Sequence, residues 1–355
     1  MASIHEVAKK AGVSTATVSR TFSAPDLISQ ETRGRVLEAA RVLNYRPRGS
    51  RAPLPELDTW DLSGPVPEAA RDYIGFQFFS AEPEDTLSTN AFYLPMLSGA
   101  QSEAANLGMH LLLHESDRRA GAQDLPKMVQ DHVVGGMLLV GMAEPDTLSA
   151  FARSVPRVVL LDHRDEAGTF ESVISDGTRG ARALTEHLLG LGHRRIAFFM
   201  CEQNVPAFMD RLRGYEAALR KAGLSPDPGL VISGDSKAAA RHNLHALLAS
   251  PGRPTAVMAS NDYYAFVAMT VARELGLKLP LDLSITGFDD LPMCTHTHPA
   301  LTTVRVEKEF MGRLAVRRLH ARMHASQASL AEPCICSQVP VSVVNRESTG
   351  PPRRP

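Results

Sequence analysis

Apolar residues recur at helical spacing in three short segments within the first 47 residues of the chain. A serine precedes each segment, at Ser3, Ser14 and Ser29, where a hydroxyl can cap a helix, and Gly12 allows the left-handed backbone of a tight turn. The pattern predicts three short helices around one small core. The inward positions are Ile4, Val7, Ala8 and Ala11 in the first segment, Val18 in the second, and Val36, Leu37, Ala40 and Leu43 in the third.

A different pattern begins at Tyr73, where apolar runs alternate with amphipathic segments. Five such runs, from YIGFQFF to SVISD, are followed by four more, from RIAFFM to SITGFDD. This alternation is typical of a parallel sheet covered by helices on both faces, and its restart near Thr178 indicates a second sheet. The predicted fold class is an N-terminal three-helix helix-turn-helix headpiece followed by an α/β body of two doubly wound parallel-sheet lobes.

The chain divides at a stretch that has neither pattern. Residues 48–72 are rich in proline and small residues, and we interpret them as a linker. Residues 1–47 form the predicted headpiece and residues 73–345 the body, which a tail at 346–355 follows. Within the body we assign residues 73–175 and 305–325 to lobe one, and residues 176–304 and 326–345 to lobe two.

Charge separates the headpiece from the body. Residues 1–54 contain nine lysines and arginines against four acidic residues, whereas the whole chain has a net charge of −1. A basic headpiece on an acidic body is expected of a protein that binds nucleic-acid phosphates, although a helical bundle without a DNA partner is the alternative. The second helix of a helix-turn-helix lies in the DNA major groove, and here its outward residues are Thr15, Ala16, Thr17, Ser19 and Arg20.

Composition argues against a membrane protein and against an enzyme. No apolar stretch approaches 18 residues and the chain begins with a capped helix, so we expect a cytoplasmic protein. The four cysteines are too few and too scattered for a disulfide framework. A metal bound by Cys294, His296 and His298 is an alternative to histidines at a surface or pocket rim, but no fourth ligand is evident. Without a phosphate-binding loop or a nucleophile, base and acid set, we predict no catalytic residue and no cofactor.

Polar residues gather where the predicted strands end. Open α/β sheets bind ligands beyond the carboxyl ends of their strands, and two lobes of similar size would face a common cleft. The aspartates among these residues have an alternative role as N-caps of the helices that follow, but we interpret the group as a ligand pocket. Its members are His114, Glu115, Asp162, Asp176, Asn261, Asp262 and Asp289.

Several strings along the chain resemble the LacI/GalR family of bacterial repressors. They are IHEVAKKAGVSTATVSR, VLNYRP, LGHRRIAFF, DRLRGYEAAL, RPTAVMASND, LSITGFDD, PALTTVRV and VNREST. The resemblance implies a body like a periplasmic sugar-binding protein. It also implies that Thr15, Ala16 and Arg20 contact base edges, that Ser3, Thr17, Ser19, Ser29 and Tyr45 contact phosphates, and that Leu54 is the leucine that enters the minor groove.

The same resemblance implies roles in an effector pocket. Arg211 would clamp the ligand, although the residues alone also allow it to pair with Asp210 or Glu216. The other positions carried over are Asn90 and Phe92 ahead of the first regulatory helix, Asp176 at the crossing between lobes, and Asn261, Asp262 and Asp289 at strand ends.

Three segments depart from the family pattern. A glycine and two prolines surround Leu54, and proline inside a helix costs about 3 kcal/mol, so we do not expect a regular hinge helix there. The acidic stretch at residues 82–85 is interpreted as a solvated loop. Where the family often places a stacking aromatic, this chain has Ser236, so a stacking ring must come from elsewhere or be absent.

Together these observations predict a dimeric, ligand-responsive transcription factor, most simply a repressor that binds a roughly palindromic operator of double-stranded DNA. One short helix contacts only a few base pairs, so paired headpieces are needed for affinity. Carboxylates and amides suit a polyhydroxylated effector, and we expect a sugar or sugar derivative first and a nucleoside second. An activator of the same family and a solute-binding module without DNA activity are the alternatives.

Overall fold

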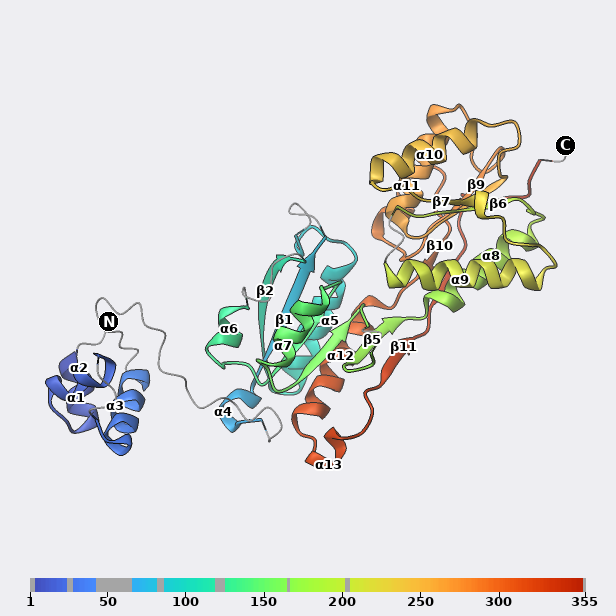
Figure 1. The fold of residues 1–355 in the computed structure, drawn as a ribbon. Helices are drawn as coiled ribbons and strands as arrows, with labels where there is room; N and C mark the ends of the chain where they lie inside the picture. The colour runs from blue at the N-terminus through green and yellow to red at the C-terminus, as the bar shows by residue number, and fades with distance from the viewer. Residues whose placement is uncertain are drawn as a thin grey trace. The chain divides into compact units, whose positions relative to one another are not determined.

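The computed structural model describes residues 4–23, 28–42, 66–81, 86–118, 125–164, 167–201 and 205–353. The chain forms two compact units, Met1–Trp60 and Asp61–Pro355 (Figure 1). The division between them falls inside the linker predicted at residues 48–72. Within the described ranges, no helix combines the length and hydrophobicity needed to cross a membrane.

The first unit contains the three predicted helices, α1 (Ile4–Ala11), α2 (Thr15–Ser23) and α3 (Gln30–Val42). The Ser14 hydroxyl accepts a hydrogen bond from the Thr17 amide at 3.1 Å and so caps α2, while Gly12 has a φ of 66° in the turn. The predicted cap Ser3 and the predicted core residue Leu43 lie outside the described residues. The buried core consists of Val7, Ala8, Ala11, Val18, Val36, Ala39 and Ala40.

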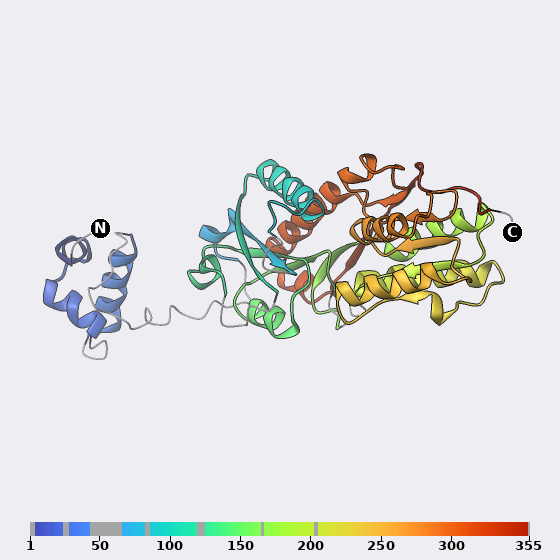
Figure 2. The ribbon, with the colours of Figure 1, turned by 90° about the horizontal axis from the view of Figure 1, so that it is seen from above.

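Lobe one of the second unit is built on a six-stranded sheet with the strand order β11-β5-β4-β3-β1-β2, and every pairing is parallel. Helices α5 and α12 cover one face of this sheet and α7 covers the other (Figure 2). The strands are β1 (Tyr73–Ser80), β2 (His110–Asp117), β3 (Gly136–Val140), β4 (Val158–Leu161), β5 (Glu171–Ser175) and β11 (Cys336–Val339). The helices are α4 (Glu68–Arg71), α5 (Tyr93–Asn106), α6 (Lys127–Gln130), α7 (Pro145–Ala152), α12 (Lys308–Met323) and α13 (Gln327–Leu330).

Lobe two is built on a four-stranded parallel sheet with the order β7-β6-β8-β9. All four residues of β6 and all four of β8 are buried. Their apolar runs predicted this burial, because a parallel strand covered on both faces is apolar throughout. The strands are β6 (Ile196–Phe199), β7 (Val231–Ile232), β8 (Ala256–Ala259) and β9 (Ser284–Thr286), and the helices are α8 (Gly177–Gly190), α9 (Pro206–Lys221), α10 (Lys237–Ala249) and α11 (Asp262–Glu274), with two 3-10 turns, η2 (Pro228–Leu230) and η3 (Pro292–Thr295).

The chain passes between the lobes three times. It enters lobe two after β5, returns through β10 (Thr303–Arg305) into α12, and leaves lobe one again through β11 into β12 (Ser342–Val344), which pairs antiparallel with β10. The predicted assignment of residues 326–345 to lobe two is wrong for β11, because Cys336 pairs in parallel register with Ser172 of β5. The strand is short and mostly exposed at the sheet edge, so its sequence carries no long apolar run to assign it.

Two glycines allow α5 and α12 to pack closely. A Cβ atom at Gly99 would lie 2.0 Å from the Glu309 carbonyl oxygen, and a Cβ atom at Gly312 would lie 2.0 Å from the Met96 carbonyl oxygen. Real Cβ atoms do not approach a backbone oxygen so closely, so only glycine fits at either position without moving the helices apart. The N-terminus of α5, where Phe92 and Tyr93 stand, is therefore fixed to the segment that arrives from lobe two.

Candidate functional site

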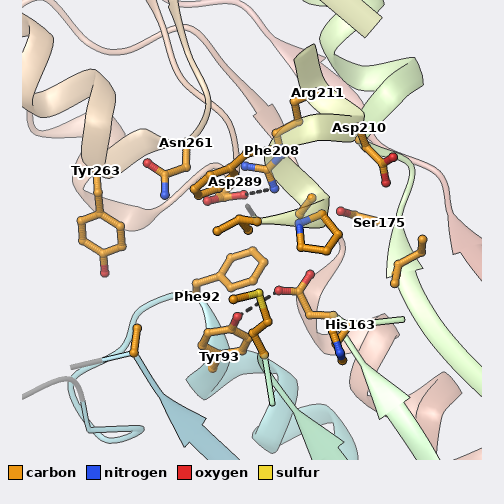
Figure 3. Close-up of a pocket in the computed structure, with 18 of the residues that line it drawn as sticks. Phe92, Tyr93, His163, Ser175, Phe208, Asp210, Arg211, Asn261, Tyr263 and Asp289 are labelled. Atoms are coloured by element: carbon orange, nitrogen blue, oxygen red, sulfur yellow. Dashed lines mark hydrogen bonds and ion pairs between the residues drawn. The ribbon is translucent and has the colours of Figure 1, made fainter. Parts of the chain in front are cut away.

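A cavity of about 250 Å³ lies between the two lobes, where the carboxyl ends of their strands meet (Figure 3). Asp162 follows β4, while Asn261 and Asp289 follow β8 and β9. The cavity is lined by six of the residues that sequence analysis selected: Asn90, Phe92, Asp162, Arg211, Asn261 and Asp289.

Arg211 and Asp289 form a buried ion pair on the lobe-two side of the cavity. A terminal guanidinium nitrogen of Arg211 lies 3.1 Å from Asp289 Oδ1, and the other terminal nitrogen donates to the Ser260 carbonyl oxygen. The guanidinium carbon is 3.8 Å from the centre of the Phe288 ring, so the cation also stacks on an aromatic face. Burial raises the pKa of Asp289, and the charges of Arg211 and Lys308 oppose that rise. The alternative pairing of Arg211 with Asp210 or Glu216 is wrong.

Asp162 brings a second carboxylate to the cavity from lobe one. It has a φ of 60°, immediately after β4, and its Oδ2 accepts a hydrogen bond from the Tyr93 hydroxyl at 3.0 Å. Burial raises the pKa of Asp162 to about 7, although Arg211 and the Tyr93 hydrogen bond lower it. Near neutral pH this carboxyl group exists in both forms, as an acceptor and as a donor.

Two amide side chains use their oxygens to fix the backbone around the cavity. Asn90 Oδ1 accepts hydrogen bonds from the amides of Phe92 and Tyr93, both at 3.0 Å. Asn261 Oδ1 accepts from the amide of Tyr264 at 2.9 Å and caps α11. Because its oxygen is engaged in the cap, the amide nitrogen is the group that Asn261 offers to the cavity.

Aromatic residues that sequence analysis missed form much of the remaining wall. Ser236 caps α10 through the Ala239 amide at 3.1 Å and does not line the cavity. The sequence did contain a signal for Phe208, because it stands three residues before Arg211 and shares its face of α9. The aromatic lining residues besides Phe92 are Phe79, Tyr93, Phe208, Tyr263 and Tyr264.

An ion pair joins the two lobes beside the cavity. Arg164, which follows β4 in lobe one, donates to Asp210 of α9 at 3.0 Å. Arg213 also pairs with Asp210, so one carboxylate holds a cation from each lobe. Nothing in the sequence indicated this contact, because the two residues lie 46 positions apart in different predicted elements.

Four predicted site residues do not line the cavity: His114, Glu115, Asp176 and Asp262. Glu115 lies in β2 beside His114, and its Oε2 accepts from the Leu87 amide at 3.1 Å. His114 lies within β2, in register with Gln77, and its Nδ1 is 2.9 Å from Gln77 Oε1; β2 continues to Asp117, so His114 does not end the strand. Asp176 caps α8 by accepting from the Arg179 amide at 3.0 Å. Their positions fit the simpler roles of a strand residue and a helix cap.

Asp262 is fully buried behind the cavity, not in its wall. Its carboxylate accepts from the Thr303 hydroxyl at 2.6 Å, the Leu291 amide at 2.8 Å and the Cys294 thiol at 3.1 Å. Burial raises the pKa of Asp262 to about 7. As the first residue of α11, it faces the segments that follow β9 and ties them to the helix.

The cysteine and histidine run at 294–298 does not form a cluster of ligands in this structure. Cys294 is buried against Asp262, and burial raises the pKa of its thiol. His296 lies in an exposed turn with Nδ1 3.1 Å from the Pro292 carbonyl oxygen. Across the described part of the chain, no three histidine, cysteine or acidic residues stand close enough together to hold a metal ion.

The headpiece presents its second helix to solvent. Ala16, Ser19 and Arg20 are exposed, and Thr15 and Thr17 are partly exposed, as expected for residues that face DNA. The Ser29 hydroxyl accepts from the Thr32 amide at 3.4 Å and so caps α3. Ser3, Tyr45, Leu54 and the acidic residues 82–85 lie outside the described residues.

Comparison with known proteins matches both units of the chain. Residues 3–48 match the model for bacterial regulatory proteins of the lacI family, and residues 185–349 match the periplasmic binding protein-like domain. The HTH-type transcriptional repressor CytR of Escherichia coli (strain K12) is 31% identical over 328 residues, which cover 91% of this chain and 90% of CytR.

Solved structures give the same result. A transcriptional regulator CelR–cellobiose complex superposes with a TM-score of 0.69 and 26% identity, covering 98% of this chain and 100% of CelR. The lac repressor dimer bound to operator and the anti-inducer ONPF superposes with a TM-score of 0.64 and 25% identity, covering 98% and 99%. The fold and the site define a ligand-responsive DNA-binding regulator. The chain belongs to the LacI family of bacterial transcriptional regulators.

Proposed function

We propose that this regulator is a cytoplasmic repressor that binds a pseudo-palindromic operator as a homodimer and releases or tightens that hold when a small polyhydroxylated effector binds. A sugar or sugar derivative is the first candidate for the effector and a nucleoside the second. In the headpiece, Arg20 is exposed on α2, where its guanidinium can form two hydrogen bonds with a guanine. One such helix spans few base pairs, which favours two heads on two half-sites.

The observation that carries the effector proposal is the pair of carboxylates that enter one cavity from opposite lobes. Asp162 comes from lobe one and Asp289 from lobe two. Arg211, on α9, lines the cavity beside Asp289. Hydroxyl groups donate well to carboxylates, and a ligand that contacts both lobes stabilises the closed arrangement over the open one. An effector can change DNA affinity only if it binds one arrangement of the lobes more tightly than the other.

One named relative supports the first candidate ligand, the sugar. CelR is described as a complex with cellobiose, a sugar, and superposes over nearly the whole chain. The aromatic wall around Phe92 and Phe208 suits a sugar ring and a nucleobase alike. The sugar is placed first because the cavity joins two carboxylates to an amide and a guanidinium, the groups that hydroxyls bind.

DNA binding is tested by enriching duplexes from a randomised library with the full-length protein. We expect a palindromic motif, two chains per duplex, and an affinity that falls steeply between about 50 and 200 mM salt. A motif without two-fold symmetry, one chain per duplex, or no salt-sensitive binding would contradict the proposal. A reporter gene that carries the enriched motif then distinguishes a repressor from an activator by the sign of its response.

Effector binding is tested by thermal shift and calorimetry with D-ribose, D-glucose, cellobiose, cytidine and adenosine. We expect at least one sugar to raise the melting temperature of the body and to change the affinity of the full-length protein for the enriched duplex. Binding of a nucleoside but of no sugar would move the assignment to the second candidate. Binding of none of these compounds would refute the proposed effector class.

A further inference from the structure

In each lobe, a series of aromatic rings in contact runs from the sheet to the cavity. In lobe one, Phe78 of β1 contacts Tyr93 with ring centres 5.1 Å apart, and Tyr93 contacts Phe92 at 5.0 Å. Phe78 is fully buried and Phe92 is 7% exposed, so this series runs from the sheet to the cavity wall. Since each ring is held edge-on or tilted by the next, Phe92 has little freedom to turn away.

Lobe two contains a matching series. Phe199 at the end of β6 contacts Tyr264 of α11 at 5.9 Å, and Tyr264 contacts Phe208 of α9 at 5.8 Å, both edge to face. The Arg211 guanidinium carbon lies 5.7 Å from the centre of the Phe208 ring, so the ion pair with Asp289 supports it from a second side. Phe208 is partly exposed and lines the cavity, whereas Phe199 is buried in the sheet.

Figure 3 shows the two ends of these series on opposite sides of the cavity, Phe208 reaching in from lobe two and Phe92 from lobe one. Asp289 lies near Phe208 in this view. On the other side, Asp162 accepts a hydrogen bond from the hydroxyl of Tyr93, the neighbour of Phe92. The position where sequence analysis expected a stacking ring carries Ser236, which is used as the cap of α10. On the lobe-two side of the cavity, Phe208 of α9 is a lining ring.

We propose that Phe208 is the lobe-two stacking residue of this regulator, so that its effector is a closed-ring molecule held between Phe208 and Phe92. This inference rests on the proposed function and narrows its effector class. The ring presents its apolar face to the phenyl groups and its hydroxyls, at the ring edge, to Asp162 and Asp289. An open-chain polyol with the same hydroxyls offers no such face, and it also loses more conformational entropy on binding.

The test compares cyclic compounds with their reduced, open-chain forms on the full-length protein by calorimetry. The pairs are D-ribose with ribitol and D-glucose with sorbitol, and cytidine serves as a second kind of ring. The variants are Phe208→Leu, which keeps an apolar side chain without a ring, and Phe208→Tyr, which keeps the ring. Phe310→Leu is the matched control, because Phe310 is 37% exposed on α12 and does not line the cavity.

For the sugar that binds better of D-ribose and D-glucose, we expect at least about tenfold tighter binding than for its alditol. Phe208→Leu should weaken its binding about tenfold, while Phe208→Tyr and Phe310→Leu stay within about threefold of the wild type. Melting temperature and affinity for the enriched duplex, measured on each variant, show that the fold is retained.

The outcomes separate this inference from the proposed function. If a sugar or nucleoside binds the wild type but Phe208→Leu binds it equally well, or if the alditol binds as tightly as the sugar, the inference is wrong and the proposed function stands. If none of the sugars and nucleosides binds, the proposed effector class fails and the inference fails with it.

Discussion

The headpiece and the cavity are both recognition sites, but the chain builds them in opposite ways. The described part of the headpiece buries small side chains such as Val7, Ala11 and Val36. The polar residues Ser19 and Arg20 stay on the outside of α2, whereas Thr21 of the same helix is 1% exposed. The body buries its polar residues instead, with Arg211 at 3% and Asp289 at 4% exposure. A surface that binds a long polyanion works while hydrated, whereas a pocket for a small neutral molecule gains specificity from groups already desolvated and paired.

The comparison shows where each site is vulnerable. Arg20 is exposed and does not support the headpiece core, so under the proposed function its loss should change DNA affinity alone. Arg211 and Asp289 form a buried pair that lines the cavity, so under the proposed function their loss should affect both effector binding and folding, because an unpaired buried charge is costly. Substitutions in the two units should therefore differ in which measurements they change.

The largest effect is expected for Arg211→Met. It leaves the Asp289 carboxylate buried beside the cavity without its cation, so we expect a loss of about 3 kcal/mol in stability of the body and at least a hundredfold loss of effector affinity. Arg213→Met on the same helix is the control, because Arg213 is 56% exposed. Urea denaturation and calorimetry measure the two quantities. An Arg211 variant with wild-type effector affinity would remove the basis for a pocket around this pair.

Asp262→Ala should come next, and it should affect stability more than binding. The change leaves the Thr303 hydroxyl, the Leu291 amide and the Cys294 thiol without their acceptor, at a cost of about 2 to 3 kcal/mol. Asp176→Ala, which removes only the α8 cap, should cost about 1 kcal/mol. Equal losses for the two variants in urea denaturation would show that the buried carboxylate is no more than a cap.

Arg20→Ala tests the other half of the comparison. Removal of a bidentate guanine contact should weaken binding to the enriched duplex by about 2 kcal/mol, near thirtyfold, with no change in the melting temperature of either unit. Arg20→Lys keeps the charge but not the two-pronged geometry, so it should retain binding to non-specific DNA and lose most of the preference for the enriched motif. Fluorescence anisotropy measures both affinities. A destabilised headpiece would contradict the exposed position of Arg20.

A smaller effect is expected from pH, through Asp162. Its pKa in the folded protein is about 7, above the ordinary 3.8, so the folded state holds this proton more tightly than the unfolded state does. The stabilisation that results is present at low pH and is lost as the pH rises towards and through 7. Relative to the wild type, Asp162→Asn should therefore be more stable at pH 8 than at pH 6.

The same titration should affect the effector. A hydroxyl donates to the ionised form of Asp162, so wild-type affinity should rise from pH 6 to pH 8, and the rise should be smaller in Asp162→Asn. Arg211, Asp289 and the Tyr93 hydroxyl also face this carboxyl group, and they are present in both proteins. An identical pH profile for wild type and variant would exclude Asp162 as the responsible group.

The smallest effect is expected at the ion pair between the lobes. Arg164 is 33% exposed, so Arg164→Gln should change effector affinity only a few-fold. Because Asp210 keeps Arg213 as a partner, this variant should fold normally. Asp210→Asn also removes the pair with Arg213, but Arg164 is the partner that joins the lobes, so it should change affinity to a similar extent. The double variant should add little, since both substitutions remove the same contact between the lobes. Fully additive effects would show that the two residues act separately.

Periodicity in the sequence predicted the elements of both units but not every residue of the site. The inward positions of α1 to α3 and the buried strands of both sheets follow from apolar spacing, and Asp162 and Asp289 follow from their places at strand ends. The sequence does not say which of two neighbours faces a cavity, so Asn261 lines it while Asp262 points behind it.

The missed contacts depend on distances that no local pattern encodes. His114 was placed at a strand end because its run of leucines stops there, yet β2 continues as an edge strand paired with β1. Phe208 and Asp210 lie at the start of α9, and their neighbours in space come from α11 and from the segment after β4. The edge strand β11 was also assigned to the wrong lobe, because its place depends on its pairing with β5 and not on its own sequence.

The position of β11 determines how the cavity can open. It lies beside β5 in one sheet, and its Val339 carbonyl accepts from the Asp176 amide at 2.9 Å, while the second passage, through β10, adjoins lobe two by a bridge between Asp289 and Arg305. Three parallel tethers resist sliding and twisting but still permit bending about the line that joins them. We therefore expect a hinge motion about the strand crossings, in which the separation between the lobes is largest at the end of the cavity farthest from the crossings.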